Sequence, residues 1–188
     1  QHGLSEPQKG RLLFSELRCA SCHATEAVKQ KKGPDLSLVG SRLNPDFIQR
    51  FIASPHSVDS GTQMPDLLAG NSKRNEIAEA LTHYLISRTG NSFIEGVVEQ
   101  EEVGPGKKLF EKIGCVNCHL PGKGVQLSHV PSKYGVDSLS EFLFQPLHAR
   151  PSGRMPDMNL TREEAKSIAS YLIGFKAVRL SEFKPVAA

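Results

Sequence analysis

Hydrophobic side chains recur in this chain every three or four residues, the spacing that places them on one face of an α-helix. Leu13, Phe14 and Leu17 form the first such stripe, and Ile168 and Leu172 belong to the last. The helices are predicted over residues 6–17, 45–54, 73–87, 105–113, 138–145 and from 161 onward. The hydrophobic pattern therefore predicts an all-α fold.

Local signals define the ends of some of these helices. Asn44 is a favourable N-cap residue, and Pro45 suits the first helical position that follows it. Thr161 and Glu164 have the spacing of a capping box at the start of the last helix. Pro55 is expected to end the helix that begins at Pro45.

The landmarks of the first half of the chain return in the same order in the second half. A Gly-x-x-Leu-Phe segment returns after 96 residues, Met-Pro-Asp after 91 and Tyr-Leu-Ile after 87. The pairs are 10–14 with 106–110, 64–66 with 155–157, and 84–86 with 171–173. An unchanged order with shrinking separations indicates a duplicated domain whose loops have shortened.

The repeat divides the chain into two predicted domains, residues 1–90 and 105–188, joined by a linker over residues 91–104. The linker contains Phe93 and Val97 and is too apolar for a free tether. We therefore expect part of the linker to pack against a domain as an extended strap or short strand.

Each half also contains one Cys-x-x-Cys-His segment, the attachment signature of a c-type haem. The residues are Cys19, Cys22 and His23, and Cys115, Cys118 and His119. In this chemistry the two cysteines bond to the haem vinyl groups, and the adjacent histidine becomes the proximal iron ligand. Two matches with the same flanking residues predict two covalently attached c-type haems.

Two other uses of paired cysteines fit the sequence less well. Zinc ribbons separate their pairs by about 15–20 residues, whereas 92 residues lie between Cys22 and Cys115. Zinc binding also gives no role to a histidine directly after each pair. A thioredoxin-like redox site would need an alternating strand–helix pattern, which is absent. Haem attachment is the interpretation that the spacing favours.

Methionines at matching places are the candidates for the distal iron ligands. Met64 and Met155 are each followed by Pro-Asp in a predicted loop after a short helix. A thioether ligand raises the potential of a haem relative to a second histidine. Met158 is a nearby competitor of Met155, and a methionine can equally fill a core.

Composition excludes some classes of function. The chain has 188 residues, 38% of them hydrophobic, and all four cysteines lie in the two motifs. The formal charge is only +3, without a long basic stripe, so nucleic-acid binding has no support.

No apolar run approaches the ~20 residues of a membrane span. Residues 1–3 show no signal peptide, as expected of a mature form.

With these motifs, each half resembles a class I cytochrome c, and the pair is similar to tandem dihaem cytochromes of the c-four group. The resemblance implies an all-α fold of two tandem cytochrome c-like domains, each wrapped around one haem. It implies that the carbonyl oxygen of Pro34 accepts the ring N–H of His23. It also implies a periplasmic or otherwise extracytoplasmic location.

The same resemblance implies that the first and last helices of each domain cross closely. Gly10 would lie against Tyr84, and Gly106 against Tyr171. The residue types support this independently, because a glycine on one helix lets an aromatic stripe on the other approach.

The leading functional hypothesis is an electron carrier that passes single electrons between a donor and an acceptor protein by transient docking. The basic tract over residues 29–32 is either a solvated loop or a docking patch for an acidic partner. A membrane-bound partner is compatible with this hypothesis. The alternatives are a dihaem enzyme such as a peroxidase, with one open haem, and an electron-relay module cut from a larger oxidoreductase.

Overall fold

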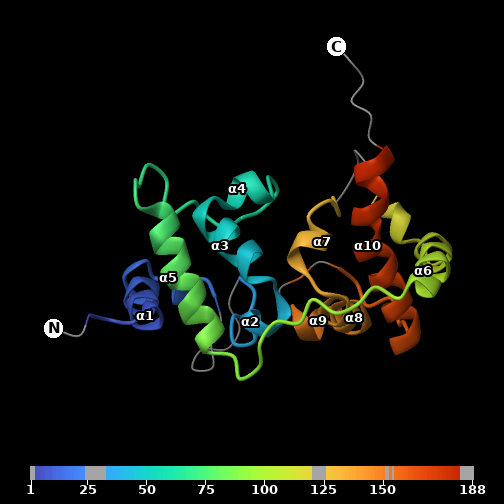
Figure 1. Ribbon diagram of the computed structural model, residues 1–188, viewed down its shortest axis with the longest axis horizontal. Helices are drawn as coiled ribbons and strands as arrows, with labels where there is room; N and C mark the ends of the chain where they lie inside the picture. The colour runs from blue at the N-terminus through green and yellow to red at the C-terminus, as the bar shows by residue number, and fades with distance from the viewer. Residues whose placement is uncertain (1–2, 24–32, 120–125, 151–152, 154, 183–188) are drawn as a thin grey trace, which may run out of the picture.

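The computed structural model describes residues 3–23, 33–119, 126–150, 153 and 155–182, with side chains as far as Gly174 (Figure 1). Within these ranges the only regular elements are helices. The predicted all-α fold is therefore confirmed.

The two halves contain the same series of helices. The first half has α1 (Glu6–Glu16), the 3₁₀ turn η1 (Cys19–Ser21), α2 (Val39–Arg42), α3 (Pro45–Ala53), α4 (Pro55–Val58) and α5 (Arg74–Ser87). The second has α6 (Gln100–Lys112), η2 (Cys115–Asn117), α7 (Val130–Lys133), α8 (Val136–Phe144), α9 (Pro146–Ala149) and α10 (Arg162–Glu182). Helices α7, α8 and α9 repeat the lengths of α2, α3 and α4 at a separation of 91 residues.

In each half the first and last long helices cross at the predicted glycine. A Cβ atom on Gly10 would overlap the carbonyl oxygen of Ala80 and lie 2.6 Å from the Cβ of Tyr84. A Cβ atom on Gly106 would overlap the carbonyl oxygen of Ser167 in the same way. Only glycine permits this backbone approach between α1 and α5, and between α6 and α10.

Small apolar cores form around these two crossings. In the first half the buried members of the main cluster are Phe14, Val39, Ile48, Leu81 and Leu85. In the second half they are Phe110, Val130, Val136, Leu139, Leu143, Leu160, Ala165, Ile168 and Ala169. The phenylalanine of each cluster packs on the crossing tyrosine, with ring centroids 5.4 Å apart in the first half and 5.7 Å in the second.

Helix α6 begins at Gln100, five residues before the predicted start, and contains Pro105. Acidic residues in its first turn suit the positive end of the helix dipole. Contacts from α10 also hold this end, because the Lys166 ammonium donates to Glu99 at 2.7 Å and the Ser167 hydroxyl donates to Glu102. The preference of proline for helix ends is overridden by this tertiary packing.

The segment that joins the halves is an extended strap along the second half (Figure 1). The backbone N–H of Val136 donates to the carbonyl oxygen of Glu95 at 2.9 Å. Gly135 lies so close to the strap that a Cβ atom there would overlap the Ile94 carbonyl oxygen. The expected packing of the linker on a domain is thus observed, while its boundaries at residues 91 and 104 remain a prediction.

No helix in the described part of the chain combines the length and apolar composition that crossing a bilayer requires.

Candidate haem centres

The first Cys-x-x-Cys-His segment forms a tight turn directly after α1. Arg18 takes a left-handed conformation with φ of 54° and turns the chain into η1. The backbone N–H groups of Cys22 and His23 then both donate to the carbonyl oxygen of Cys19, at 3.2 and 3.0 Å. One turn of backbone therefore carries both sulfur atoms and the imidazole.

The second segment repeats this geometry after α6. Gly114 supplies the left-handed position, with φ of 92°. The N–H groups of Cys118 and His119 donate to the carbonyl oxygen of Cys115 at the same 3.2 and 3.0 Å. No signal in the sequence indicates that a non-glycine residue, Arg18, holds the matching position in the first half.

No disulfide joins the four cysteines, and they differ in exposure in the same way in each motif. Cys19 and Cys115 are half-buried and pack against the cores, whereas Cys22 and Cys118 are exposed. Burial raises the pKa of the Cys19 and Cys115 thiols. Among the described residues no three His, Cys, Asp or Glu side chains gather as a zinc site would require.

The structure brings His23 together with Pro34. The ring nitrogen Nδ1 of His23 lies 3.0 Å from the carbonyl oxygen of Pro34. Gly33 holds this approach, because its N–H donates to the Cys22 carbonyl oxygen at 2.7 Å and a Cβ atom on it would lie 2.8 Å from the imidazole. If Nδ1 carries the proton, Nε2 keeps its lone pair for a metal.

The equivalent contact in the second half would involve residues 120–125, which lie outside the described residues. The basic tract 29–32 also lies outside them. His119 itself is half-buried, like His23. No Gly-Pro-Asp-Leu segment follows His119 in the sequence.

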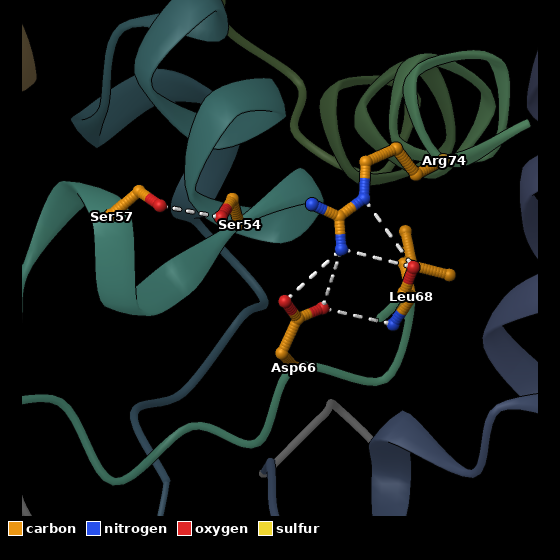
Figure 2. Close-up of polar contacts among 5 residues, drawn as sticks. All are labelled: Ser54, Ser57, Asp66, Leu68 and Arg74. Atoms are coloured by element: carbon orange, nitrogen blue, oxygen red, sulfur yellow. Dashed lines mark hydrogen bonds and ion pairs between the residues drawn. The ribbon is translucent and has the colours of Figure 1, made fainter. Parts of the chain in front are cut away.

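Met64 lies half-buried in the loop between α4 and α5, and ionic and backbone contacts brace this loop (Figure 2). The Met64 N–H donates to the Thr62 hydroxyl at 3.2 Å. Beyond it, the Arg74 guanidinium pairs with the Asp66 carboxylate at 3.1 Å and donates to the Leu68 carbonyl oxygen at 3.0 Å. Arg74 is the first residue of α5, and sequence reasoning did not single it out.

Met155 and Met158 both lie between α9 and α10, half-buried and packed against the second core. Here the Asp157 carboxylate accepts the N–H of Asn159 at 2.8 Å. The first residue of α10, Arg162, pairs instead with Glu141 of α8. Among the described residues of the second methionine loop, no arginine contact equivalent to the brace of the first half is found.

The residues around the first turn fit a haem. Apolar side chains that touch the first core remain only half-buried, as does Cys19, which packs against the same core. They are Leu13, Leu17, Ala20, Leu36, Leu43, Ile52, Ile77 and Tyr84. A flat apolar ring system bonded to the thiols would cover such side chains, and the imidazole can offer one nitrogen to its iron.

Comparison with known families identifies the type of domain in the first half, because residues 7–87 match the family model described as cytochrome c. This chain contains a cytochrome c domain. The match spans α1 to α5 and includes the turn of Cys19, Cys22 and His23. The resemblance to c-type cytochromes is confirmed, and a cytochrome c domain implies a covalently bound c-type haem.

Two curated relatives extend the comparison. Over 86 residues, 38% of this chain and 58% of the relative, the chain is 34% identical to the C subunit of the nitric oxide reductase of Cereibacter sphaeroides. Over 172 residues, 85% of this chain and 56% of the relative, it is 24% identical to the CcoP subunit of the cbb3-type cytochrome c oxidase of Helicobacter pylori. The chain thus spans a little over half the length of each relative. No solved structure matches it.

Proposed function

We propose that this protein is a dihaem electron-transfer cytochrome, with one haem on Cys19 and Cys22 and the other on Cys115 and Cys118. The supporting observation is the repetition of one turn geometry, with the same two hydrogen bonds, after the first long helix of each half. The proposed domains are residues 1–90 and 105–188. The alignment with CcoP, which runs through both halves, is consistent with a tandem arrangement.

The proposed iron ligands are His23 with Met64, and His119 with Met155. When bound, the haem supplies one-electron chemistry at its iron. The polypeptide then has three tasks: it orients each imidazole, keeps a thioether available opposite it, and covers the ring with apolar side chains. For His23, donation of the Nδ1 proton to Pro34 would fix the tautomer and the ring orientation.

We further propose that the haem domains are extracytoplasmic and exchange electrons with redox proteins by transient docking. The two relatives are by name subunits of a nitric oxide reductase and of a cytochrome oxidase. A relay module within a larger oxidoreductase, with a membrane-bound partner, is therefore the form of the hypothesis that these relatives favour. In that case the electron acceptor would be a neighbouring subunit or domain.

A dihaem peroxidase is the competing function, and ligation of the irons distinguishes it. A carrier needs both irons saturated, whereas a peroxidase needs one distal position open to its substrate and an acid–base group beside it. A methionine in each half at the matching place favours the carrier.

The test combines a haem count with three substitutions. The haem-loaded protein should contain two haems, and its ferric spectrum should show the methionine-to-iron charge-transfer band for both. Met64→Ala and Met155→Ala should each remove about half of that band and open one iron to carbon monoxide. Met158→Ala is the matched control and should change neither. One haem per chain, or one high-spin iron with peroxide turnover, would contradict the proposal.

A further inference from the structure

The helix pairs α1 with α5 and α6 with α10 are two copies of one arrangement, so the same surface can be compared in both halves. The residues that meet at the two crossings are Gly10, Ala80 and Tyr84 in the first half and Gly106, Ser167 and Tyr171 in the second. These residues align α1 with α6 at a separation of 96 and α5 with α10 at a separation of 87. Each residue of one pair therefore has a counterpart in the other.

In the second half the strap covers one stripe of α10, formed by Lys166, Ser170 and Gly174 at intervals of four residues. The Lys166 ammonium donates to the Glu99 carboxylate at 2.7 Å. A Cβ atom on Gly174 would lie 3.1 Å from Cγ1 of Val98, so the strap lies directly on the helix there. Ser170, one turn from each of these contacts, is 0% exposed. The strap thus binds this stripe through one apolar contact and one ion pair.

The same stripe of α5 in the first half is exposed. Its residues Glu79, His83 and Ser87 are the counterparts of Lys166, Ser170 and Gly174. The side chains of Glu79 and His83 are 56% and 50% exposed. Helices α1 and α5 lie at the opposite end of the molecule from α6 and α10 (Figure 1). A Cβ atom on Gly3, the counterpart of Glu99, would meet nothing within 4 Å. The surface that is covered in one half is therefore open in the other.

The charge of the stripe is reversed between the halves, because Glu79 stands where Lys166 stands in the second half. The Glu79 carboxylate lies 4.0 Å from Nε2 of His83, and no lysine or arginine of the described residues pairs with it. Glu76, one turn earlier, adds a second exposed carboxylate to this side of α5. A segment that covered α5 as the strap covers α10 would need a cation in the place of Glu99.

The apolar part of the contact has a counterpart in the first half. Val103 of α6 lies 3.3 Å from the Cβ position of Gly174, and its counterpart on α1 is the half-buried Pro7. Ser87 replaces Gly174 by another small residue. An apolar side chain in the place of Val98 would therefore be removed from water between α1 and α5. Since an exposed ion pair contributes little, this burial would supply the affinity and the charge would select the partner.

We infer that Glu79, His83 and Ser87, together with Pro7, form a docking surface for an extended segment of a partner protein in which an apolar residue directly precedes a lysine or arginine. The occupied counterpart in the second half supports an extended segment, and the reversed charge supports the cation. The segment lies along α5 as the strap lies along α10. This inference goes beyond the proposed function, because it depends on the repeated helix pair and not on the haems.

The probe is a fluorescent peptide with the sequence of residues 93–103 and the change Glu99→Lys, titrated with the haem-loaded protein and followed by anisotropy. The control peptide keeps Glu99. We expect the changed peptide to bind about tenfold more tightly than the control, because attraction to Glu79 replaces repulsion. In the protein variant Glu79→Lys this preference should reverse. Glu111→Lys, at an exposed position of α6, is the matched control for net charge and should keep the preference of the wild type.

Binding of neither peptide at about 1 mM, equal affinities of the two peptides, or a preference that Glu79→Lys does not reverse would overturn the docking surface. Sedimentation tests a different occupant. If the wild type self-associates and Glu79→Lys prevents it, the surface binds a second copy of this chain and the assignment to a partner segment is wrong.

A haem count separates this inference from the proposed function. Fewer than two haems in a chain that still prefers the changed peptide would contradict the function alone. Two haems in a chain without this preference would contradict only the docking surface.

Discussion

The Nδ1 atom of His23 lies 3.0 Å from the carbonyl oxygen of Pro34, eleven residues further along the chain. The contact depends on Gly33, whose backbone lies against both Cys22 and the imidazole. A hydrogen bond from the ring nitrogen that does not bind the metal makes a metal-bound histidine more basic and fixes its orientation. The first turn and the segment that follows residue 32 therefore form one unit around the proposed proximal ligand.

Gly33→Ala should break this unit. Its methyl group would lie 2.8 Å from Nδ1 of His23, so the ring or the backbone must move and the hydrogen bond must lengthen. A less basic imidazole stabilises ferric iron less, and we expect the potential of the first haem to rise by roughly 60 mV, a tenfold change in equilibrium. Redox titration measures it. Gly61→Ala, whose methyl group meets nothing closer than 3.4 Å, is the control; equal potentials in the two variants would contradict the prediction.

The crossing of α6 and α10 offers a test of packing with a control two residues away. In Gly106→Ala the new methyl group overlaps the backbone of Ser167, and the helices must separate. We expect a loss of about 3 kcal/mol in the free energy of unfolding, from overpacking. Gly104 lies in the same helix with nothing within 4 Å of its Cβ position.

Gly104→Ala should change stability by less than about 1 kcal/mol, because its gain in helix propensity is opposed by the ring of Pro105. Denaturant unfolding of the haem-loaded proteins measures both values. If the two variants were equally stable, the close approach of α6 to Ser167 would not be a constraint on the fold.

Arg74→Gln tests the brace on the first methionine loop. The substitution removes the ion pair to Asp66 and the hydrogen bond to Leu68, each made by a charged group. Loss of these contacts should make the observed conformation of the Met64 loop less stable by about 1–2 kcal/mol. Because Met64 is the proposed ligand in this loop, added imidazole should bind the ferric first haem about tenfold more tightly.

Arg162→Gln is the counterpart in the second half, since Arg162 also begins its helix but pairs with Glu141 rather than with the methionine loop. Imidazole affinity should be unchanged in that variant. A similar increase in both variants would show that the effect comes from helix stability and not from the brace.

The elements with local signals were predicted well from the sequence. The capping box is formed as expected, with the Thr161 N–H donating to Glu164 at 2.9 Å and the Glu164 N–H to the Thr161 hydroxyl at 3.2 Å. Asn44 caps α3 and Pro45 begins it. The glycine crossings were also expected, from the resemblance to class I cytochromes c and from a glycine on one helix that lets the aromatic stripe of the other approach.

Several other features that depend on tertiary contacts were not predicted. Pro55 was expected only to end a helix, yet it also begins α4, because proline suits the first helical position. The ion pair of Arg74 joins it to Asp66, eight positions away. The Arg42 guanidinium of the first half donates to the carbonyl oxygen of Ala149 in the second half, 107 positions away. No periodicity or spacing indicates such contacts, since they depend on how the helices pack.

The contact between the two halves should also make the free energy of unfolding depend on pH, through His129 of the second half. Burial lowers the pKa of this imidazole, and the nearby charges of Lys133 and Arg150 act in the same direction while Asp59 opposes them. In the unfolded chain the pKa returns to about 6.5. Between the two values the unfolded chain holds a proton that the folded chain lacks, so the free energy of unfolding should fall as pH decreases below about 6.5.

His129→Gln should remove this component and leave a shallower dependence on pH, whereas His83→Gln, exposed on α5, should keep the dependence of the wild type. Unfolding free energies of the three haem-loaded proteins between about pH 7.5 and 5.5 measure the difference. Because Phe47 stacks on His129 from the other half, the loss at acid pH should include separation of the halves. If the free energies of unfolding of the three proteins changed with pH in the same way, the charge on His129 would have no part in holding the two halves together.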